Sequence, residues 1–211
     1  MSRFNGERLV SSPVAPVPFG LYQVEADDLK LLKLYAKQLK ESPQRVPIQT
    51  PANVEEVYEG SNFLNDLVCS FVFPATKSLI NELPKTHRWR LLNSWVEYRK
   101  KGDMLPPSQM LGGDMSFVVW INIPYDIEEE MAHPRCSKTS NPCATKTQML
   151  YTNPIGKMTA KEFVFSKADE GVIMIYPSSV LLQSFPFYTS DEDCIIMRGS
   201  LVVEEIPVPK N

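Results

Sequence analysis

The side chains of this chain that could act as nucleophiles, bases or metal ligands are few and scattered. The 211 residues include only 2 histidines and 4 cysteines. His133, Cys136 and Cys143 fall in one short segment, and imidazole and thiolate are the ligands that zinc prefers. Without a Cys-x-x-Cys pair, these residues fall short of the usual spacing of a zinc site. The pattern therefore predicts no metal centre, although it leaves metal binding by this segment open.

Other catalytic patterns are missing from the sequence. It contains no glycine-rich phosphate loop and no Gly-x-Ser-x-Gly nucleophile turn. Cys194 begins the run CIIM, where a thiol is typical of a buried apolar side chain. No single residue therefore indicates nucleophilic catalysis.

Composition narrows the class of protein. With 43% apolar and 22% charged residues the chain resembles ordinary soluble proteins, and its net charge of −3 without a basic cluster argues against nucleic acid as the main partner. No apolar run of about twenty residues is present, so we expect neither a membrane span nor a membrane partner. Unpaired cysteines without a secretory signal predict reduced thiols and a location inside the cell.

Two strand-like runs organise the chain. The run from 89 to 98 predicts a strand. Because successive side chains of a strand point to opposite faces, we expect Trp89, Leu91, Asn93 and Trp95 to share one face. The run SFVVWINI, 116 to 123, predicts a strand buried on both faces. Between the two, a Lys-Gly-Asp turn, two prolines and a Gly-Gly pair predict a loop.

The remaining elements follow from periodicity. Apolar spacing predicts helices over 25–41 and 62–83, with a break or kink at Pro74. Further strands are expected at 148–152, 162–166, 171–176 and 193–205. The acidic run 128–130 is expected to form a solvated turn or a short helix.

This pattern divides the chain into four parts. A proline-rich arm covers 1–20, a helical region covers 21–86, a strand-rich domain covers 87–206 with an insertion at about 125–147, and 207–211 form a tail. The arm is either a tail draped on the surface or a segment that orders on a neighbouring subunit. In the second case its apolar anchors would be Val14, Val17 and Phe19.

The segment from 89 to about 205 resembles the phage and bacterial branch of the 2-oxoglutarate, iron(II)-dependent oxygenase family. The shared frame is a Ser-Trp-Val strand, a Lys-Gly-Asp turn, a proline-rich loop, a Ser-x-Val strand and a closing segment, IYPSSVLLQSFPFYTSDEDCIIMRGSL. The resemblance implies an α+β, mainly β fold: a double-stranded β-helix, a cupin-like jelly roll, buttressed by N-terminal helices. It also implies an iron site of two histidines and a carboxylate, and an arginine that binds 2-oxoglutarate.

The family's site positions are occupied by other residues in this chain. The ligand positions fall on Ser108, Met110 and Leu182, and the arginine position falls on Cys194. A hydroxyl, a thioether and an isobutyl group do not replace two imidazoles and a carboxylate. A different set of donors would have to recruit Glu97, Asp103, Asp114 or His133.

The resemblance thus implies a catalytically inactive oxygenase fold with no cofactor, used as a structural or assembly module. The family branch implies a tailed-phage virion component that assembles with itself and with other virion proteins, or otherwise a cytoplasmic protein. The alternative is an active 2-oxoglutarate and iron(II)-dependent dioxygenase with unusual ligands. A barrel mouth that binds a glycan is also left open.

Overall fold

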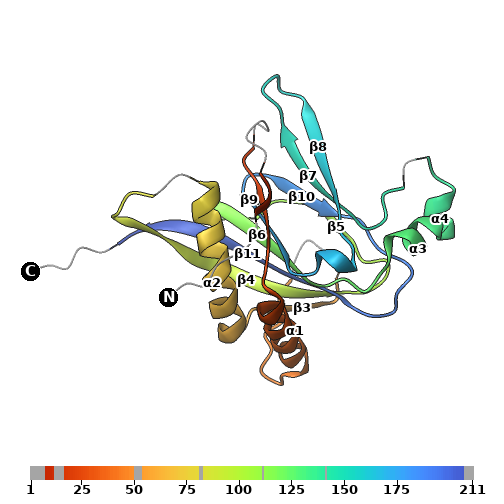
Figure 1. Ribbon diagram of the computed structural model, residues 1–211, viewed down its shortest axis with the longest axis horizontal. Helices are drawn as coiled ribbons and strands as arrows, with labels where there is room; N and C mark the ends of the chain where they lie inside the picture. Colours follow the sequence, from red (N-terminus) through yellow and green to blue (C-terminus); the bar gives the residue numbers. More distant parts are fainter. Residues whose placement is uncertain are drawn as a thin grey trace, which may run out of the picture.

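The computed structural model describes residues 8–11, 17–49, 54–80, 83–110, 112–140 and 142–206. Two antiparallel sheets face each other, and helices cover the outer side of the larger sheet (Figure 1). This arrangement confirms the predicted mainly β, double-stranded β-helix architecture with N-terminal helices. Among the described residues, no helix combines the length and apolar character needed to cross a membrane.

The larger sheet has the strand order β1-β2-β9-β6-β11-β4-β3. Its strands are β1 (Arg8–Ser11), β2 (Gly20–Gln23), β3 (Glu56–Glu59), β4 (His87–Arg99), β6 (Met115–Asn122), β9 (Val172–Pro177) and β11 (Cys194–Glu205). The long strands β4, β6, β9 and β11 match the runs expected from sequence. The short strands β1, β2 and β3 extend the sheet at its edges and were not predicted.

The smaller sheet has the order β5-β10-β7-β8. Its strands are β5 (Leu105–Ser108), β7 (Lys146–Thr152), β8 (Met158–Val164) and β10 (Leu181–Ser184). The prediction of a loop across Pro106 and Pro107 was wrong, because these prolines lie in β5 at the end of the sheet. Proline lacks an N–H group and is therefore tolerated in an edge strand.

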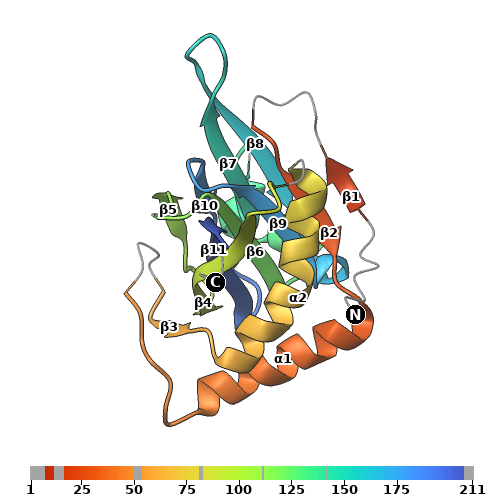
Figure 2. The ribbon, with the colours of Figure 1, turned by 90° about the vertical axis from the view of Figure 1, so that its left-hand side faces the viewer.

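Two helices lie side by side against the outer face of the larger sheet (Figure 2). They are α1 (Ala26–Glu41) and α2 (Asn62–Leu79). The helix α2 continues through Pro74 and ends before Ile80, several residues earlier than expected. Its start is fixed by Ser61, whose hydroxyl accepts a hydrogen bond from the N–H of Leu64.

The side chains of the larger sheet divide between two apolar clusters. Val96 and Tyr98 of β4 pack toward the helices, with Leu32 of α1 and Val68 of α2 in the same cluster. The second cluster fills the space between the two sheets and includes Trp120. Strand alternation therefore sends the odd-numbered residues of β4 from Trp95 onward toward the smaller sheet.

A bulge in β4 changes which of its residues share a face. Asn93 lies opposite Ser200 of β11, but the next pair is Leu91 with Leu201, so one residue of β4 is unpaired. As a result, Leu91 and Trp89 pack against the helix-side cluster, whereas Trp95 lines a cavity between the sheets. The prediction that these residues share one face was wrong because a bulge shifts the alternation by one.

The N-terminal segment packs on its own chain where it is described. Phe19 is 2% exposed and meets Phe163 edge to face at 5.5 Å between ring centroids. Val17 is half-buried against the same inter-sheet cluster. Val14 lies outside the described residues.

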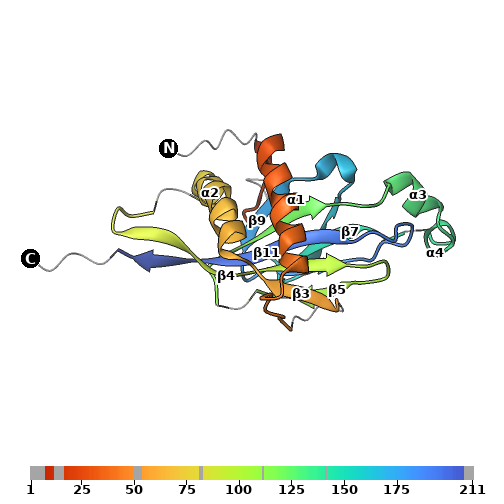
Figure 3. The same ribbon diagram turned by 90° about the horizontal axis from the view of Figure 1, so that it is seen from below.

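The insertion forms two short helices at one end of the molecule, away from α1 and α2 (Figure 3). They are α3 (Ile127–Ala132) and α4 (Pro134–Ser137). The prediction of a solvated acidic run was wrong for Glu130, which is fully buried. Its carboxylate accepts hydrogen bonds from the N–H groups of Tyr188 and Thr189 and from the Thr189 hydroxyl.

Candidate functional site

The odd-numbered residues of β4 place charges inside the barrel. Glu97 is fully buried, and Arg99 on the same strand is 4% exposed. Arg198 of β11 is 2% exposed and reaches the same carboxylate from the neighbouring strand. In the register of β4 and β11, Arg198 lies opposite Trp95, two residues before Glu97, so its side chain is a diagonal neighbour of Glu97.

The carboxylate of Glu97 has a partner at each oxygen. Its Oε1 accepts a hydrogen bond from Trp95 Nε1 at 3.0 Å and lies 3.0 Å from Arg198 Nε. Its Oε2 accepts a hydrogen bond from Arg99 Nε at 2.7 Å and also contacts Arg99 Nη2. Burial raises the pKa of Glu97, but Arg198 and Arg99 outweigh it and hold this pKa below its ordinary value. Glu97 is therefore charged at neutral pH.

Arg198 is less completely paired. Its Nη2 is buried and has no hydrogen-bond partner within the described part of the chain. Burial lowers the pKa of Arg198 and Glu97 opposes this, but a guanidinium remains protonated in proteins. One carboxylate thus faces two guanidinium groups, so this ion-paired cluster has one more positive than negative charge.

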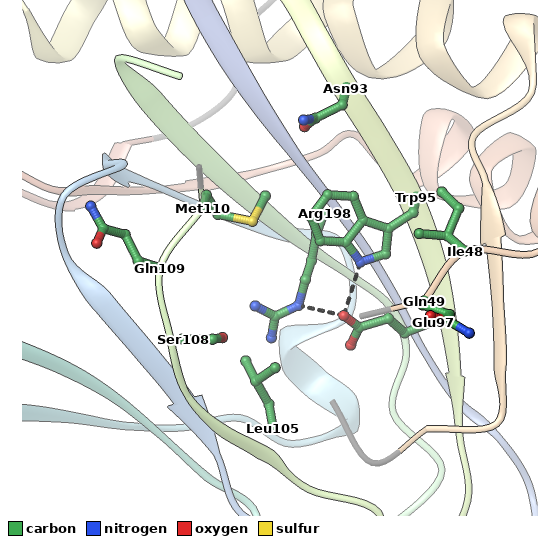
Figure 4. A pocket seen from close by; sticks show the side chains of 10 residues that line it. All are labelled: Ile48, Gln49, Asn93, Trp95, Glu97, Leu105, Ser108, Gln109, Met110 and Arg198. Carbon is green, nitrogen blue, oxygen red and sulfur yellow. Dashed lines mark hydrogen bonds and ion pairs between the residues drawn. The ribbon is translucent and has the colours of Figure 1, made fainter. Parts of the chain in front are cut away.

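A cavity of about 230 Å³ opens beside Arg198, and residues of β4, β5 and β11 are among those that line it. Figure 4 shows the guanidinium of Arg198 reaching toward Glu97, with Ser108 and Met110 on the opposite wall. The full lining is Ile48, Gln49, Asn93, Trp95, Glu97, Leu105, Ser108, Gln109, Met110 and Arg198. Charge is therefore concentrated at one wall, and the other walls are apolar or amide-bearing.

A second buried polar atom lies on the same face of the larger sheet. The hydroxyl of Tyr176 in β9 has no hydrogen-bond partner among the described residues, and Tyr176 is 1% exposed. Burial raises the pKa of Tyr176 to about 12, although the charge of Arg198 opposes this. Tyr176 does not line the cavity, so it contributes to the polar interior behind Arg198.

The structure brings together three of the four positions that the resemblance indicated. Ser108 lies opposite Leu182 in the pairing of β5 with β10, and its hydroxyl lies 3.5 Å from the Leu182 carbonyl oxygen. Met110 and Ser108 line the same cavity. Cys194 lies elsewhere, on a separate cavity of about 20 Å³ with Arg99 and Asp103.

The other donors suggested by sequence do not converge. Asp114 accepts a hydrogen bond from the Val203 N–H at 2.8 Å, and Asp103 accepts one from the Lys100 N–H at 2.8 Å. His133 accepts one from the Arg135 N–H and stacks on Tyr188 at 5.2 Å. Among the described residues, no group of three or more His, Cys, Asp or Glu side chains could hold a metal ion.

These residues do not fit the iron centre of the resembled family. Among the described residues that line the cavity, Glu97 is the only carboxylate, and its oxygens already contact Trp95, Arg99 and Arg198. A non-haem iron site needs imidazole and carboxylate ligands with free lone pairs. A carboxylate ligand, by contrast, fits the unpaired Nη2 of Arg198.

Sequence reasoning missed Arg198 and Trp95 as site residues and named Glu97 only as a possible metal donor. The available signal was a charge inside an apolar strand, since Arg198 interrupts CIIMRGSL and Glu97 stands between Val96 and Tyr98. A charge in such a strand requires a buried partner. Which partner it finds depends on the register of β4 and β11.

No protein-family model matches the chain, and no curated protein matches it in sequence. Solved structures do match it. An oxidoreductase of the 2OG-Fe(II) oxygenase family from Burkholderia pseudomallei aligns with a TM-score of 0.58 at 6% identity, covering 91% of this chain and 88% of that one.

Two proteins of nogalamycin biosynthesis have the same fold. The non-heme alpha ketoglutarate dependent epimerase SnoN aligns with a TM-score of 0.57 at 10% identity, covering 91% of this chain and 80% of that one. The carbocyclase SnoK aligns at 0.53 and 8% identity, covering 91% and 83%. At such identities the likeness concerns the fold. The chain therefore has the double-stranded β-helix fold of the 2-oxoglutarate and iron(II)-dependent oxygenases.

Proposed function

We propose that this chain is a binding protein that receives a small carboxylate-bearing molecule in the barrel cavity, and that it does so without iron-dependent oxygenation. The observation that carries the proposal is the buried Nη2 of Arg198, which has no hydrogen-bond partner in the described residues. A buried charged donor without a hydrogen-bond partner destabilises the protein. An anion that pairs with this donor removes that cost, which makes the free energy of binding more favourable.

The position of Arg198 supports recognition rather than a purely structural role. A structural ion pair with Glu97 would need one guanidinium, and Arg99 already provides it through Nε and Nη2. Arg198 adds a second positive charge on the wall of the cavity. Guanidinium groups bind carboxylates with two parallel hydrogen bonds, which makes them suited to this recognition.

Isothermal titration calorimetry with a series of small carboxylates and their uncharged amides tests the proposal. We expect saturable binding of carboxylates and much weaker binding of amides. The Arg198→Lys variant keeps the charge but loses the planar fork, and should bind carboxylates at least about tenfold more weakly. Arg88→Lys, at an exposed arginine paired with Glu204, is the matched control. If no carboxylate binds at millimolar concentration, the proposal is wrong.

An active 2-oxoglutarate-dependent oxygenase with unusual ligands is the second candidate, and the structural neighbours favour it. One of them is described in complex with Fe3+ and alpha ketoglutarate, with a TM-score of 0.53. Thermal unfolding with manganese(II) and 2-oxoglutarate, separately and together, distinguishes the candidates. Ligand at about 100 times its Kd stabilises a fold by ~2.7 kcal/mol, so stabilisation that requires both additives would favour the oxygenase.

The structural role that the resemblance implies remains a prediction. A homo-oligomeric virion component would reveal itself by its mass in solution, and light scattering at several concentrations measures this directly. A stable oligomer would support an assembly role for this chain in addition to the binding of a ligand in the barrel.

A further inference from the structure

The charges that line the cavity indicate which kind of carboxylate it can bind. This inference rests on the proposed function, that the cavity binds a carboxylate. Arg198 is the only cation among the described residues that line the cavity, and Glu97 is the only anion. Within the described lining, the cavity therefore offers a single cationic partner.

We propose that the ligand is a monocarboxylate with an apolar body, and that 2-oxoglutarate and other dicarboxylates are discriminated against. One carboxylate pairs with the guanidinium of Arg198. A second carboxylate on the same molecule would be moved out of water toward neutral amides and apolar walls. Desolvating a charge without an ionic partner is unfavourable, so the second carboxylate lowers affinity.

The walls of the cavity suit an apolar body. Ile48, Trp95, Leu105 and Met110 supply aliphatic, aromatic and thioether surface. The indole N–H of Trp95 is already donated to Glu97, so this ring presents only carbon atoms to a ligand. The volume of about 230 Å³ is small beside the ~300–1,000 Å³ of drug-sized sites, which indicates a compact molecule.

The polar groups at the cavity are neutral. Gln49, Asn93, Gln109 and Ser108 carry amide or hydroxyl groups, and the Asn93 Oδ1 already accepts a hydrogen bond from Ser200 at 2.6 Å. Neutral donors compensate a buried carboxylate about half as well as charged donors. They favour a ligand with a hydroxyl or carbonyl group over one with a second charge.

Three probes of equal length test the proposal by calorimetry on the full chain: hexanoate, adipate and hexanamide. They differ only in carrying one carboxylate, two carboxylates or a neutral amide. We expect hexanoate to bind at least about tenfold more tightly than hexanamide, which lacks the charge that pairs with Arg198, and than adipate, whose second carboxylate loses its hydration without an ionic partner. Titration with 2-oxoglutarate should give the weak affinity of adipate.

The outcomes separate this inference from the proposed function. If no probe binds, or if hexanamide binds as well as hexanoate, the role of Arg198 in recognition fails and the proposed function fails with it. If adipate or 2-oxoglutarate binds as tightly as hexanoate, only the preference for monocarboxylates is overturned.

A variant that adds a second cation provides the reciprocal test. Met110 is half-buried on the cavity wall, so Met110→Lys places an ammonium group across from Arg198 without emptying the core. We expect this variant to reverse the preference, so that adipate binds more tightly than hexanoate. The matched control is Met104→Lys, at a 38% exposed methionine that does not line the cavity. An unchanged preference in folded Met110→Lys would overturn the proposal, and circular dichroism verifies folding.

Discussion

Arg198 and Glu97 hold their charged groups 3.0 Å apart, between Nε and Oε1, with side chains that are 3% and 0% exposed. Arg99 approaches the same carboxylate from its other oxygen. The barrel interior is thus organised around one negative charge that satisfies two positive charges incompletely. This relationship determines how the chain should respond to substitution and to pH.

Replacing Glu97 by Gln should destabilise the protein strongly. The amide cannot neutralise Arg99 and Arg198, and removing one member of a buried ion pair typically costs about 3–5 kcal/mol. Urea unfolding followed by tryptophan fluorescence measures the loss. Glu204→Gln, which removes an exposed partner of Arg88 and Arg90, is the control and should change stability little. An equally small effect at Glu97 would contradict this account of the cluster.

The same carboxylate should make stability depend on acidity. The pKa of Glu97 lies below its ordinary value of 4.5 in the folded protein, because Arg198 and Arg99 outweigh the opposing effect of burial. The stabilisation is therefore complete above about pH 4.5 and is lost as the pH falls through the lower, folded pKa. In unfolding experiments across the acid range, the difference between wild type and Glu97→Gln should narrow as the pH falls. A constant difference would refute the linkage.

Cys194 and Cys69 should react slowly with thiol reagents in the folded protein. Cys194 is 3% exposed, and burial raises its pKa to about 12. Burial also raises the pKa of Cys69 to about 11. Because the thiolate is the reactive form, both should resist iodoacetamide in the folded protein. Timed labelling followed by peptide mass spectrometry is the measurement, and denatured protein is the control. Rapid native labelling of Cys194 would show that the end of β11 opens.

Glu130 should anchor the loop that follows β10. Its carboxylate accepts hydrogen bonds from the Tyr188 N–H at 2.9 Å and from the Thr189 N–H at 2.7 Å. Glu130→Gln removes the charge and should cost about 1.5–3 kcal/mol, the usual value of a hydrogen bond to a charged group. Hydrogen exchange at the Thr189 amide should accelerate. Glu129→Gln, at a neighbouring exposed residue of the same helix, should leave that exchange rate unchanged.

Local patterns predicted the long elements well, because each of them has one strong signal. The apolar spacing from Leu32 to Leu39 predicted α1, and the unbroken run from Phe117 to Ile121 predicted a fully buried β6. The sheet edges were missed since short strands such as β3 contain too few residues to show a period. The strand β5 was missed because its prolines mask it.

The candidate site was predictable only in part. Counting within the resembled motif singled out Ser108 and Met110, and the structure places both on the wall of one cavity. The same count assigned the arginine position to Cys194, four residues before Arg198 on β11. Cys194 and Arg198 share a face but lie on different cavities. The bulge in β4 similarly depends on pairing between distant strands, which no local pattern in the sequence encodes.

The prolines of β5 have a consequence for how this chain meets other chains. An edge strand normally offers a row of N–H groups to which a foreign strand can add. In β5, Pro106 and Pro107 remove two successive donors at one end of the smaller sheet. Within the smaller sheet, a foreign strand should therefore add less readily at β5 than at the opposite edge, on β8. The proline pair protects the cavity side of the barrel against aggregation by strand addition.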